Sequence, residues 1–220
     1  MLNNFIEDFT LNNRSIISDL FYAMNCNITK CANCNIQIFN YQTYFFLVFP
    51  LEEVRKFKNN NYQYNFNNNF ISNEVNIYDC FEYDRKINLM SGENTMYCNY
   101  CKRNSNCYMC TSLVTCPEIL IILLNRGHGI EFNIKIDFPE NLNLYNYIEL
   151  KNTGFNYQLI GVITHIGESS MSGHFIAYCK DPISQTLWHK YNDAMVNEVS
   201  DFKNEVINFA MPYLLFYQKV

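Results

Sequence analysis

The sequence predicts an α+β fold in which an antiparallel β-sheet is accompanied by a few helices. Its 220 residues include 18 Phe and 17 Tyr, and aromatic residues are enriched in strands. Several runs of strand length are either continuously apolar or alternate between apolar and polar residues. The length suits one domain with a sizeable core, or two smaller domains. No internal repeat and no Gly/Ser-rich linker marks a boundary, so we expect residues 1–220 to form one elaborated domain.

The N-terminal quarter predicts one helix followed by strand-like segments. The apolar residues of Ser15–Met24 fall on one helical face, and Asn13 can cap that helix. We expect this helix to pack on the sheet. Cys26–Cys34 has the composition of a hairpin-like turn. The aromatic and β-branched run Tyr41–Phe49 (YQTYFFLVF) predicts one buried strand that ends at Pro50.

The middle of the chain mixes a polar insertion with regular elements. Residues 56–70 are Asn-rich (KFKNNNYQYNFNNN over Lys56–Asn69), and their low aliphatic content predicts an inserted loop or a flexible tip. A helix is expected over Val75–Asp84, and Ser91 with Gly92 marks a turn. Cys107–Thr115 (CYMCTSLVT) predicts a strand that enters the core.

The C-terminal half is expected to be mostly β. Glu118–Asn125 (EILIILLN) is a continuous apolar run of strand length, and Ile130–Phe138 alternates as a half-exposed strand does. Gly127 and Gly129 supply the turn between them. The remaining expected elements are strands at Tyr157–His165, His174–Cys179, Leu187–Tyr191 and Pro212–Tyr217 and a short helix at Phe202–Phe209.

Charge and cysteine content limit the class of protein. The formal net charge is −5 and no dense Lys/Arg run occurs, which excludes a nucleic-acid binder. The longest apolar run, Ile119–Leu124, is too short to cross a membrane. The start MLNNFIEDFT has no secretory signal, so we expect an intracellular location, in the cytoplasm or nucleus. In a reducing compartment, closely spaced cysteines favour metal binding over disulfides.

Two CxxC pairs predict a structural zinc site. Four thiolates complete a tetrahedral site and leave no open position for water or substrate. The candidate ligands are Cys31, Cys34, Cys98 and Cys101. A third pair, Cys107 and Cys110, competes as the partner of Cys98 and Cys101, but the strand-like context of Cys107 favours the long-range pairing. A metal-free reading, in which all these cysteines pack in the core, remains the alternative.

The single cysteines Cys26, Cys80, Cys116 and Cys179 lie in or beside apolar runs, which predicts buried, unreactive side chains.

The strongest chemical signal is a histidine at the start of one expected strand and an Asn-Asp pair at the end of the next. His174 lies in SGHFIAYCK, and Asn192 and Asp193 end LWHKYND. In an antiparallel pair the start of one strand faces the end of its neighbour, which brings these side chains within hydrogen-bonding reach. Such a partner fixes the tautomer and orientation of the ring, as a Cys-His-Asn or Cys-His-Asp protease requires.

The other histidines carry weaker signals. His128 lies in a Gly-containing turn and His189 on a strand, and both are expected to be structural. His165 ends a strand near the proposed site, where lining of a substrate channel and a structural use are both open.

These motifs resemble the ubiquitin-specific proteases. The His box of that family is similar to GHFIAYCK and LWHKYND, and the likeness extends over nearly the whole chain. The other matching stretches are SIISDLFYAMNCNITKCANC, YQTYFFLVFPL, YCNYC, PEILIILLNR, the FP-x-x-L-x-L turn at Phe138–Leu144 and PYLLFYQK. The resemblance implies a papain-like fold with fingers mainly at residues 26–50 and 86–116 and a palm mainly at residues 117–220.

The resemblance also implies roles for the candidate residues. His174 is the expected general base, Asn192 the third member of the triad, and Asp193 a polar neighbour that assists the histidine or the oxyanion. The four CxxC cysteines take the positions of the family's finger zinc ligands. The implied reaction is hydrolysis of the isopeptide or peptide bond at the C-terminal glycine of ubiquitin, with ubiquitin or ubiquitinated proteins as partners.

The nucleophile box of that family has no counterpart here. Nothing matches G-x-x-N-x-x-x-x-C-Y-x-x-S, and the nearest candidate, Cys26 after Asn25, precedes a strand-like turn rather than a helix. We therefore expect the nucleophile outside this chain, on an N-terminal thumb segment, and expect the chain alone to be inactive. A catalytically inactive, zinc-containing ubiquitin-binding module is the alternative, and a zinc-dependent interaction domain unrelated to ubiquitin is a third hypothesis.

Overall fold

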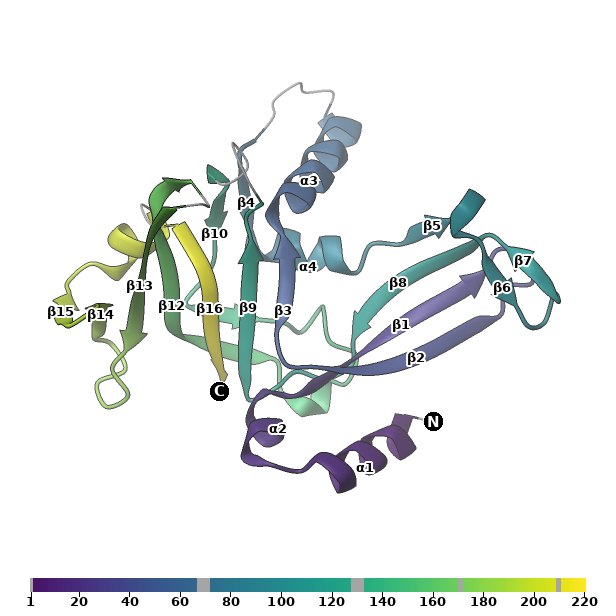
Figure 1. Ribbon diagram of the computed structural model, residues 1–220, viewed down its shortest axis with the longest axis horizontal. Helices are drawn as coiled ribbons and strands as arrows, with labels where there is room; N and C mark the ends of the chain where they lie inside the picture. The colour runs from purple at the N-terminus through teal and green to yellow at the C-terminus, as the bar shows by residue number, and fades with distance from the viewer. Residues whose placement is uncertain (1, 67–71, 128–132, 170–171, 209–210) are drawn as a thin grey trace. The chain divides into compact units, whose positions relative to one another are not determined.

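The computed structural model describes residues 2–66, 72–127, 133–169, 172–208 and 211–220 (Figure 1). The chain forms two compact units, and segments that are distant in sequence build each of them. The first unit comprises Met1–Phe45, Asp84–Pro117 and Leu144–Phe155, and the second comprises Phe46–Tyr83, Glu118–Asn143 and Asn156–Val220. Among the described residues, no helix is both long and apolar enough to span a membrane.

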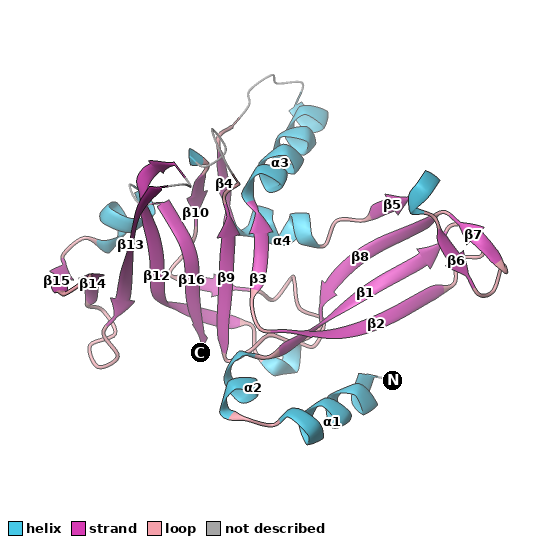
Figure 2. Ribbon diagram, viewed as in Figure 1, coloured by secondary structure: helices cyan, strands magenta, loops and turns pink. Residues whose placement is uncertain are grey.

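The first unit is built on a four-stranded antiparallel sheet in the order β2-β1-β8-β5 (Figure 2). A short hairpin of β6 and β7 and small helices accompany it. The strands are β1 (Ala23–Cys31), β2 (Gln37–Tyr44), β5 (Asn88–Met90), β6 (Met96–Cys98), β7 (Arg103–Ser105) and β8 (Cys107–Leu113). The helices are α1 (Leu2–Asn13), α2 (Ile16–Phe21) and the 3-10 turns η1 (Gly92–Asn94) and η3 (Lys151–Thr153).

The core of the first unit lies between α1 and the sheet. Met24, Cys26 and Val114 are buried, and Phe5 and Ile6 of α1 pack against them. Burial raises the pKa of the Cys26 thiol, which disfavours the reactive thiolate. Cys26 is therefore a core residue, as the sequence predicted.

The second unit contains a larger sheet in the order β15-β14-β13-β12-β16-β9-β3, with β11 paired to β12. All of its pairings are antiparallel except β3 with β9, and a separate parallel pair joins β4 and β10. The strands are β3 (Leu47–Pro50), β4 (Glu74–Asn76), β9 (Ile119–Asn125), β10 (Lys135–Asp137), β11 (Asn141–Asn143), β12 (Asn156–Ser169), β13 (Ser172–Lys180), β14 (Trp188–Asn192), β15 (Met195–Val199) and β16 (Met211–Lys219). The helices are α3 (Leu51–Phe66), α4 (Ile77–Asp84) and the π-helix η4 (Lys203–Asn208).

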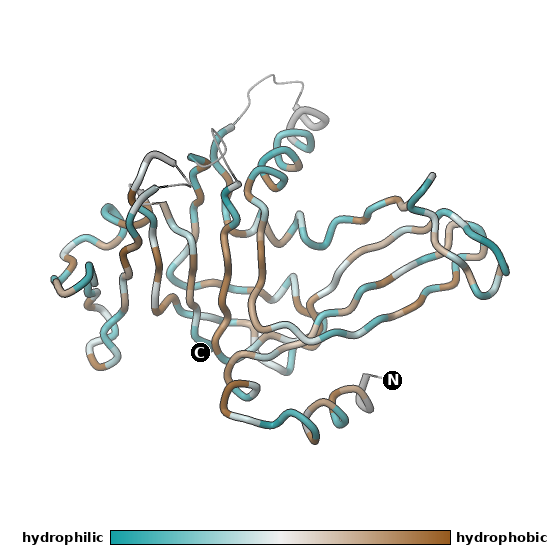
Figure 3. Tube along the Cα trace, viewed as in Figure 1, coloured by the Kyte–Doolittle hydropathy of each residue, from teal (hydrophilic) through white to brown (hydrophobic). Residues whose placement is uncertain are grey.

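The two faces of this sheet differ in burial. On one face Ile122, Leu215 and Val162 are buried neighbours, and Trp188 stacks on Phe202 ahead of η4 with ring centroids 3.7 Å apart. The strands β9 and β3 are rich in hydrophobic residues (Figure 3). The other face carries exposed apolar side chains, which include Val48, Phe175, Tyr191 and Val196. A face that is both apolar and uncovered is unusual for a soluble sheet.

Strand registers show that this uncovered face is continuous. Cross-strand partners are aligned in one row across six neighbouring pairings, and directly opposite residues share a face. The row consists of Val48, Leu123, Leu214, Ile163, Ala177, Tyr191 and Val196.

Arg126 is a buried cation that joins three segments of the second unit. It follows β9 and is only 1% exposed. Its Nε donates to the carbonyl of Pro212 at 2.8 Å, and its Nη1 donates to the carbonyl of Ile134 at 2.7 Å. Burial lowers the pKa of Arg126 to about 10, so the guanidinium remains protonated at neutral pH. It holds the end of β9, the start of β16 and the approach to β10 together.

We expect the substitution Arg126→Met to destabilise the protein by about 2–4 kcal/mol, because it leaves two buried carbonyls without their charged donor. Urea unfolding of the variant checks this value. Arg103→Met, at an exposed position, is the control and should change the free energy of unfolding by less than about 0.5 kcal/mol. Equal unfolding midpoints for both variants would show that the Arg126 bonds are not needed.

The helix expected over Ser15–Met24 is shorter and is capped differently. Ser15 is the N-cap, because its Oγ accepts from the backbone N–H of Ser18 at 3.1 Å and the Ser18 hydroxyl bonds the Ser15 backbone in return. Asn13 instead ends α1, a helix that the sequence did not predict. The expected packing of an apolar face is wrong, since no residue of α2 is buried.

Two further expectations in the N-terminal quarter are wrong. Residues 26–31 continue β1, and the turn begins only after Cys31. The run Tyr41–Phe49 is not one buried strand, because β2 ends at Tyr44 and β3 begins at Leu47 in a different sheet. An unbroken aromatic run gives no periodic signal at the point where a chain leaves one sheet for another.

The loop expected over residues 56–70 is also wrong as far as residue 66, and residues 67–70 lie outside the described part. Residues 51–66 form α3, although Asn is a poor helix former. Tertiary contacts compensate. Lys58 forms an ion pair with Asp79 at 3.0 Å and donates to the carbonyl of Glu74. Asn59 exchanges two side-chain hydrogen bonds with the backbone of Ser72.

The remaining expected elements agree more closely. The strands predicted in the C-terminal half correspond to β9, β12, β13, β14 and β16, and the helix over Val75–Asp84 corresponds to α4 after the short strand β4. Of the strand expected at Ile130–Phe138, β10 covers only Lys135–Asp137, and residues 130–132 lie outside the described part. The helix at Phe202–Phe209 is the π-helix η4, with residue 209 outside the described part. The strand β15 was missed.

Candidate active site and metal centre

The start of β13 and the end of β14 bring His174 and Asn192 together. The two strands are antiparallel, with Ala177 opposite Tyr191. The His174 Nε2 lies 2.6 Å from the Asn192 Oδ1. Because an amide oxygen only accepts hydrogen bonds, Nε2 carries the hydrogen in this arrangement. Nδ1 is then the basic nitrogen of the ring, which is the state that a general base needs.

Asp193 is close to the same ring but does not bond it. Its Oδ2 lies 3.7 Å from the His174 Nε2, and its side chain is 81% exposed. The residue has φ +52° in the tight connection to β15, where Asn192 is opposite Met195. Asp tolerates this left-handed conformation better than most residues. Asn192 is therefore the direct partner of the ring, and Asp193 contributes a nearby negative charge.

No nucleophile accompanies this pair among the described residues. The described contacts of the His174 ring include no cysteine sulfur within hydrogen-bonding distance. Cys179 lies on the same strand, but strand alternation directs its side chain to the face opposite His174. Among the described residues, the His174–Asn192 pair therefore has no thiol beside it.

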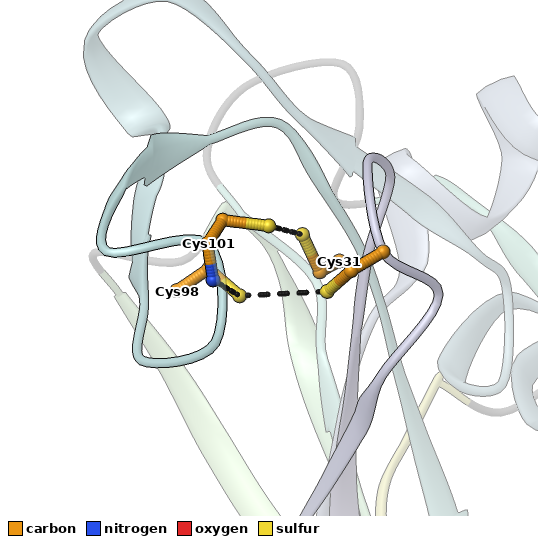
Figure 4. Close-up of side chains that lie close together, drawn as sticks. Cys31, Cys98 and Cys101 are labelled. Atoms are coloured by element: carbon orange, nitrogen blue, oxygen red, sulfur yellow. Dashed lines mark hydrogen bonds between the residues drawn. The ribbon is translucent and has the colours of Figure 1, made fainter.

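The two CxxC pairs meet in the first unit. Cys31 ends β1 and Cys34 lies in the turn that follows it. Cys98 ends β6 and Cys101 lies in the turn to β7, so that Cys31 faces Cys98 and Cys101 (Figure 4). The Sγ atoms of Cys31 and Cys101 are 3.9 Å apart, and those of Cys34 and Cys98 are 3.6 Å apart. All four sulfur atoms lie within 4.8 Å of one another.

These separations fit a tetrahedral metal site. Four thiolates about 2.3 Å from zinc lie about 3.8 Å from each other, whereas a disulfide requires about 2.05 Å. Backbone N–H groups of Cys34 and then Asn33 lower the pKa of Cys31 to about 6. Hydrogen bonding to Cys34 and burial raise the pKa of Cys101 to about 12. Four crowded thiols resist full ionisation by themselves, and a bound cation removes that resistance.

A family model described as ubiquitin carboxyl-terminal hydrolase matches residues 1–217. The chain belongs to this family. It is 29% identical over 210 residues to ubiquitin carboxyl-terminal hydrolase 21 of Homo sapiens, with 93% of the chain and 34% of that protein covered. It is 25% identical over 220 residues to ubiquitin carboxyl-terminal hydrolase Usp2 of Drosophila melanogaster, with 97% and 21% covered. The 220-residue chain thus spans about a third or less of the length of these relatives.

Comparison with solved structures gives a fold of the same family. One chain of the SAGA DUB module, a complex of Ubp8, Sgf11, Sus1 and Sgf73 bound to monoubiquitin, superposes with a TM-score of 0.74 and 22% identity. The match covers 100% of the 220-residue chain and 46% of the chain in that solved structure. The predicted α+β, papain-like deubiquitinase fold is therefore confirmed.

The other six cysteines lie outside the four-cysteine cluster. Cys107 is directly opposite Cys31 on β8 and is buried, so the compact alternative with Cys107 and Cys110 is not the arrangement observed. Cys80 and Cys116 are buried as expected. Cys179 is exposed, and its expected burial is wrong because it lies on the uncovered face of the sheet.

The other histidines have distinct surroundings. His189 is partly exposed, and its Nε2 lies 3.6 Å from a carboxylate oxygen of Asp181. His128 lies outside the described residues. His165 is 5% exposed and is opposite Phe175, while His174 is opposite Ile166, so alternation places the two rings on opposite faces. The sequence left the role of His165 open, and no local pattern signals the close contact between its ring and Gly173.

Proposed function

We propose that this chain supplies the general base and its orienting residue to a cysteine-type deubiquitinase, with the nucleophilic cysteine outside the chain. The 2.6 Å contact between His174 Nε2 and Asn192 Oδ1 carries the proposal, because it leaves Nδ1 to take a thiol proton. Family membership supports the reaction class. The substrate is the C-terminal glycyl bond of ubiquitin, a choice supported by the relatives' names and by the monoubiquitin-bound structure.

The expected chemistry follows from these positions. Nδ1 of His174 accepts the proton of the incoming cysteine, and the thiolate attacks the glycyl carbonyl to form an acyl-enzyme. The imidazolium then gives its proton to the departing amine, and water hydrolyses the thioester. Asn192 keeps Nε2–H fixed and so holds the ring in one orientation through both steps. Asp193 favours the transient imidazolium through its nearby charge.

We also propose that the cluster of Cys31, Cys34, Cys98 and Cys101 binds zinc in a structural role. The sulfur separations support this assignment. Four thiolate ligands leave no open coordination position, so the metal would join the β1–β2 and β6–β7 turns without entering the reaction.

We also propose an intracellular location, in the cytoplasm or nucleus. Ten free cysteines support a reducing compartment.

The uncovered apolar face of the larger sheet is the proposed docking surface for the thumb segment that carries the nucleophile. Val48, Tyr191 and Val196 of the apolar row are exposed there, as is the neighbouring Phe175. Burial of such a row favours a packed partner. The His174 side chain lies on the opposite face of β13, so a segment docked here would bring its cysteine to the base around the ends of β13 and β14.

A catalytically inactive ubiquitin-binding module is the second candidate. One observation favours it: no described cysteine sulfur lies within hydrogen-bonding distance of His174. The two candidates share ubiquitin binding and differ in turnover.

Turnover of a fluorogenic ubiquitin substrate tests the proposal, with ubiquitin binding measured in parallel. We expect no turnover by the 220-residue chain and clear turnover by the longest natural polypeptide that contains it, because that polypeptide would supply the cysteine. Binding without turnover by both proteins would favour the inactive module. Neither binding nor turnover by the longer polypeptide would contradict both candidates.

A further inference from the structure

The glycine before the proposed base lies directly against a buried histidine ring. A Cβ atom at Gly173 would lie 2.1 Å from Nε2 and 2.2 Å from Cε1 of His165, and 2.6 Å from the Ile166 carbonyl oxygen. Real Cβ contacts are essentially never shorter than 3.0 Å. Only a residue without a side chain therefore fits at position 173 while the His165 ring is in place.

A second glycine bounds the same ring. A Cβ atom at Gly167 would lie 2.9 Å from Cε1 of His165 and 3.0 Å from the Cα of Gly173. Gly167 of β12 and Gly173 of β13 thus both meet the ring at its Cε1 edge, where each exposes bare backbone. This arrangement lets the backbone approach an imidazole much more closely than any other residue type would permit.

Aromatic contacts fix the ring on its other sides. The His165 ring is edge-on to Phe175, with centroids 4.9 Å apart, and 5.8 Å from the ring of Tyr213. Phe175 and Tyr213 also contact each other edge-on at 5.4 Å. A flat side chain that is 5% exposed and held by two aromatic rings has little freedom to move.

We infer that His165 is a positioning residue, whose ring sets the backbone path through Gly173 and thereby the placement of His174. His165 and Gly173 are on one face of the strands, while the His174 side chain is on the other. His165 therefore acts through the backbone and does not touch the reacting atoms. Asn192 orients the His174 ring, and His165 positions the backbone that carries it. This inference rests on the proposed catalytic role of His174.

The experiment is a double-variant cycle read by the side-chain nitrogen signals of His174 in ¹⁵N-labelled protein. His174→Gln assigns the signal by removing it. We expect a single Nε2–H tautomer in the wild-type chain and averaging of the two tautomers in His165→Ala and in Gly173→Ala. Adding Gly173→Ala to His165→Ala should cause a smaller further change than Gly173→Ala causes alone, although the Ile166 carbonyl retains part of the clash.

Gly161→Ala is the matched control, on β12, the strand that carries His165. Its Cβ would be 3.5 Å from the nearest atom, an ordinary contact, so the His174 signal should not change. If Gly173→Ala unfolds the protein, melting temperatures of the four proteins provide the same cycle. Unchanged His174 signals in His165→Ala, or a Gly173→Ala effect that is independent of residue 165, would overturn the inference.

These measurements use neither ubiquitin nor a nucleophile, so the two proposals fail separately. Coupling between residues 165 and 173, together with no hydrolysis by the longer polypeptide, would reject the deubiquitinase proposal and keep the positioning role of His165. Hydrolysis without that coupling would keep the deubiquitinase proposal and reject the positioning role.

Discussion

Substitution of His174 by glutamine should reduce hydrolysis of a ubiquitin substrate by about 10⁴-fold in kcat, the upper end for loss of a general base. The variant retains a polar side chain of similar length but has no nitrogen that accepts a proton near neutral pH. Turnover by the polypeptide that supplies the cysteine is the measurement. KM should change much less than kcat, because the lost interaction belongs to the transition state.

The two neighbouring residues should give graded effects in the same assay. Asn192→Ala removes the 2.6 Å partner of the ring and should lower kcat by about 10- to 100-fold, since the base remains but is no longer oriented. Asp193→Ala, at 3.7 Å and exposed, should have a smaller effect.

His189→Gln is the matched control on β14. Its ring is paired with Asp181, away from the proposed site, so kcat should stay within about twofold of the wild-type value. Full activity of His174→Gln, or equal losses for His174→Gln and His189→Gln, would refute the assignment of the base.

Removal of the metal should produce the second large effect. We expect one zinc per chain, and Cys98→Ser should reduce that content nearly to zero. Structural zinc sites contribute on the order of 10 kcal/mol in small domains, so chelation should lower the melting temperature by about 10 °C or more. Metal content by elemental analysis and thermal unfolding of the same samples check both values. Zinc should also be released as the pH falls, because the ligands must be thiolates.

Cys179→Ser is the control for this experiment. Cys179 is an exposed cysteine outside the four-cysteine cluster, so its loss should leave the zinc content unchanged. Zinc that persists after Cys31 and Cys34 are replaced but disappears after Cys107 and Cys110 are replaced would restore the compact alternative. No zinc in the wild-type chain would reject the metal site.

Local patterns predicted the features whose cause is local. The spacing of His174 from the Asn192–Asp193 pair follows from two adjacent strands joined in sequence, and the 2.6 Å contact agrees with it. Continuous or alternating apolar runs predicted β9, β12, β13, β14 and β16 because strand periodicity is visible in single sequences. The CxxC spacing likewise identified each half of the metal cluster.

Long-range packing decided the rest. Only the fold shows that the partners of Cys98 and Cys101 are Cys31 and Cys34, and not Cys107 and Cys110. Contacts to Asp79 and Ser72 hold an Asn-rich segment as α3, and no local propensity predicts it. The need for glycine at position 173 arises from a ring eight residues away. The sequence by itself determined the periodicity of the strands and the type of metal ligand, because these depend on near neighbours. The pairing of the cysteines, the exposure of side chains and the close contact at Gly173 depend on which distant segments meet, and only the tertiary structure specifies that.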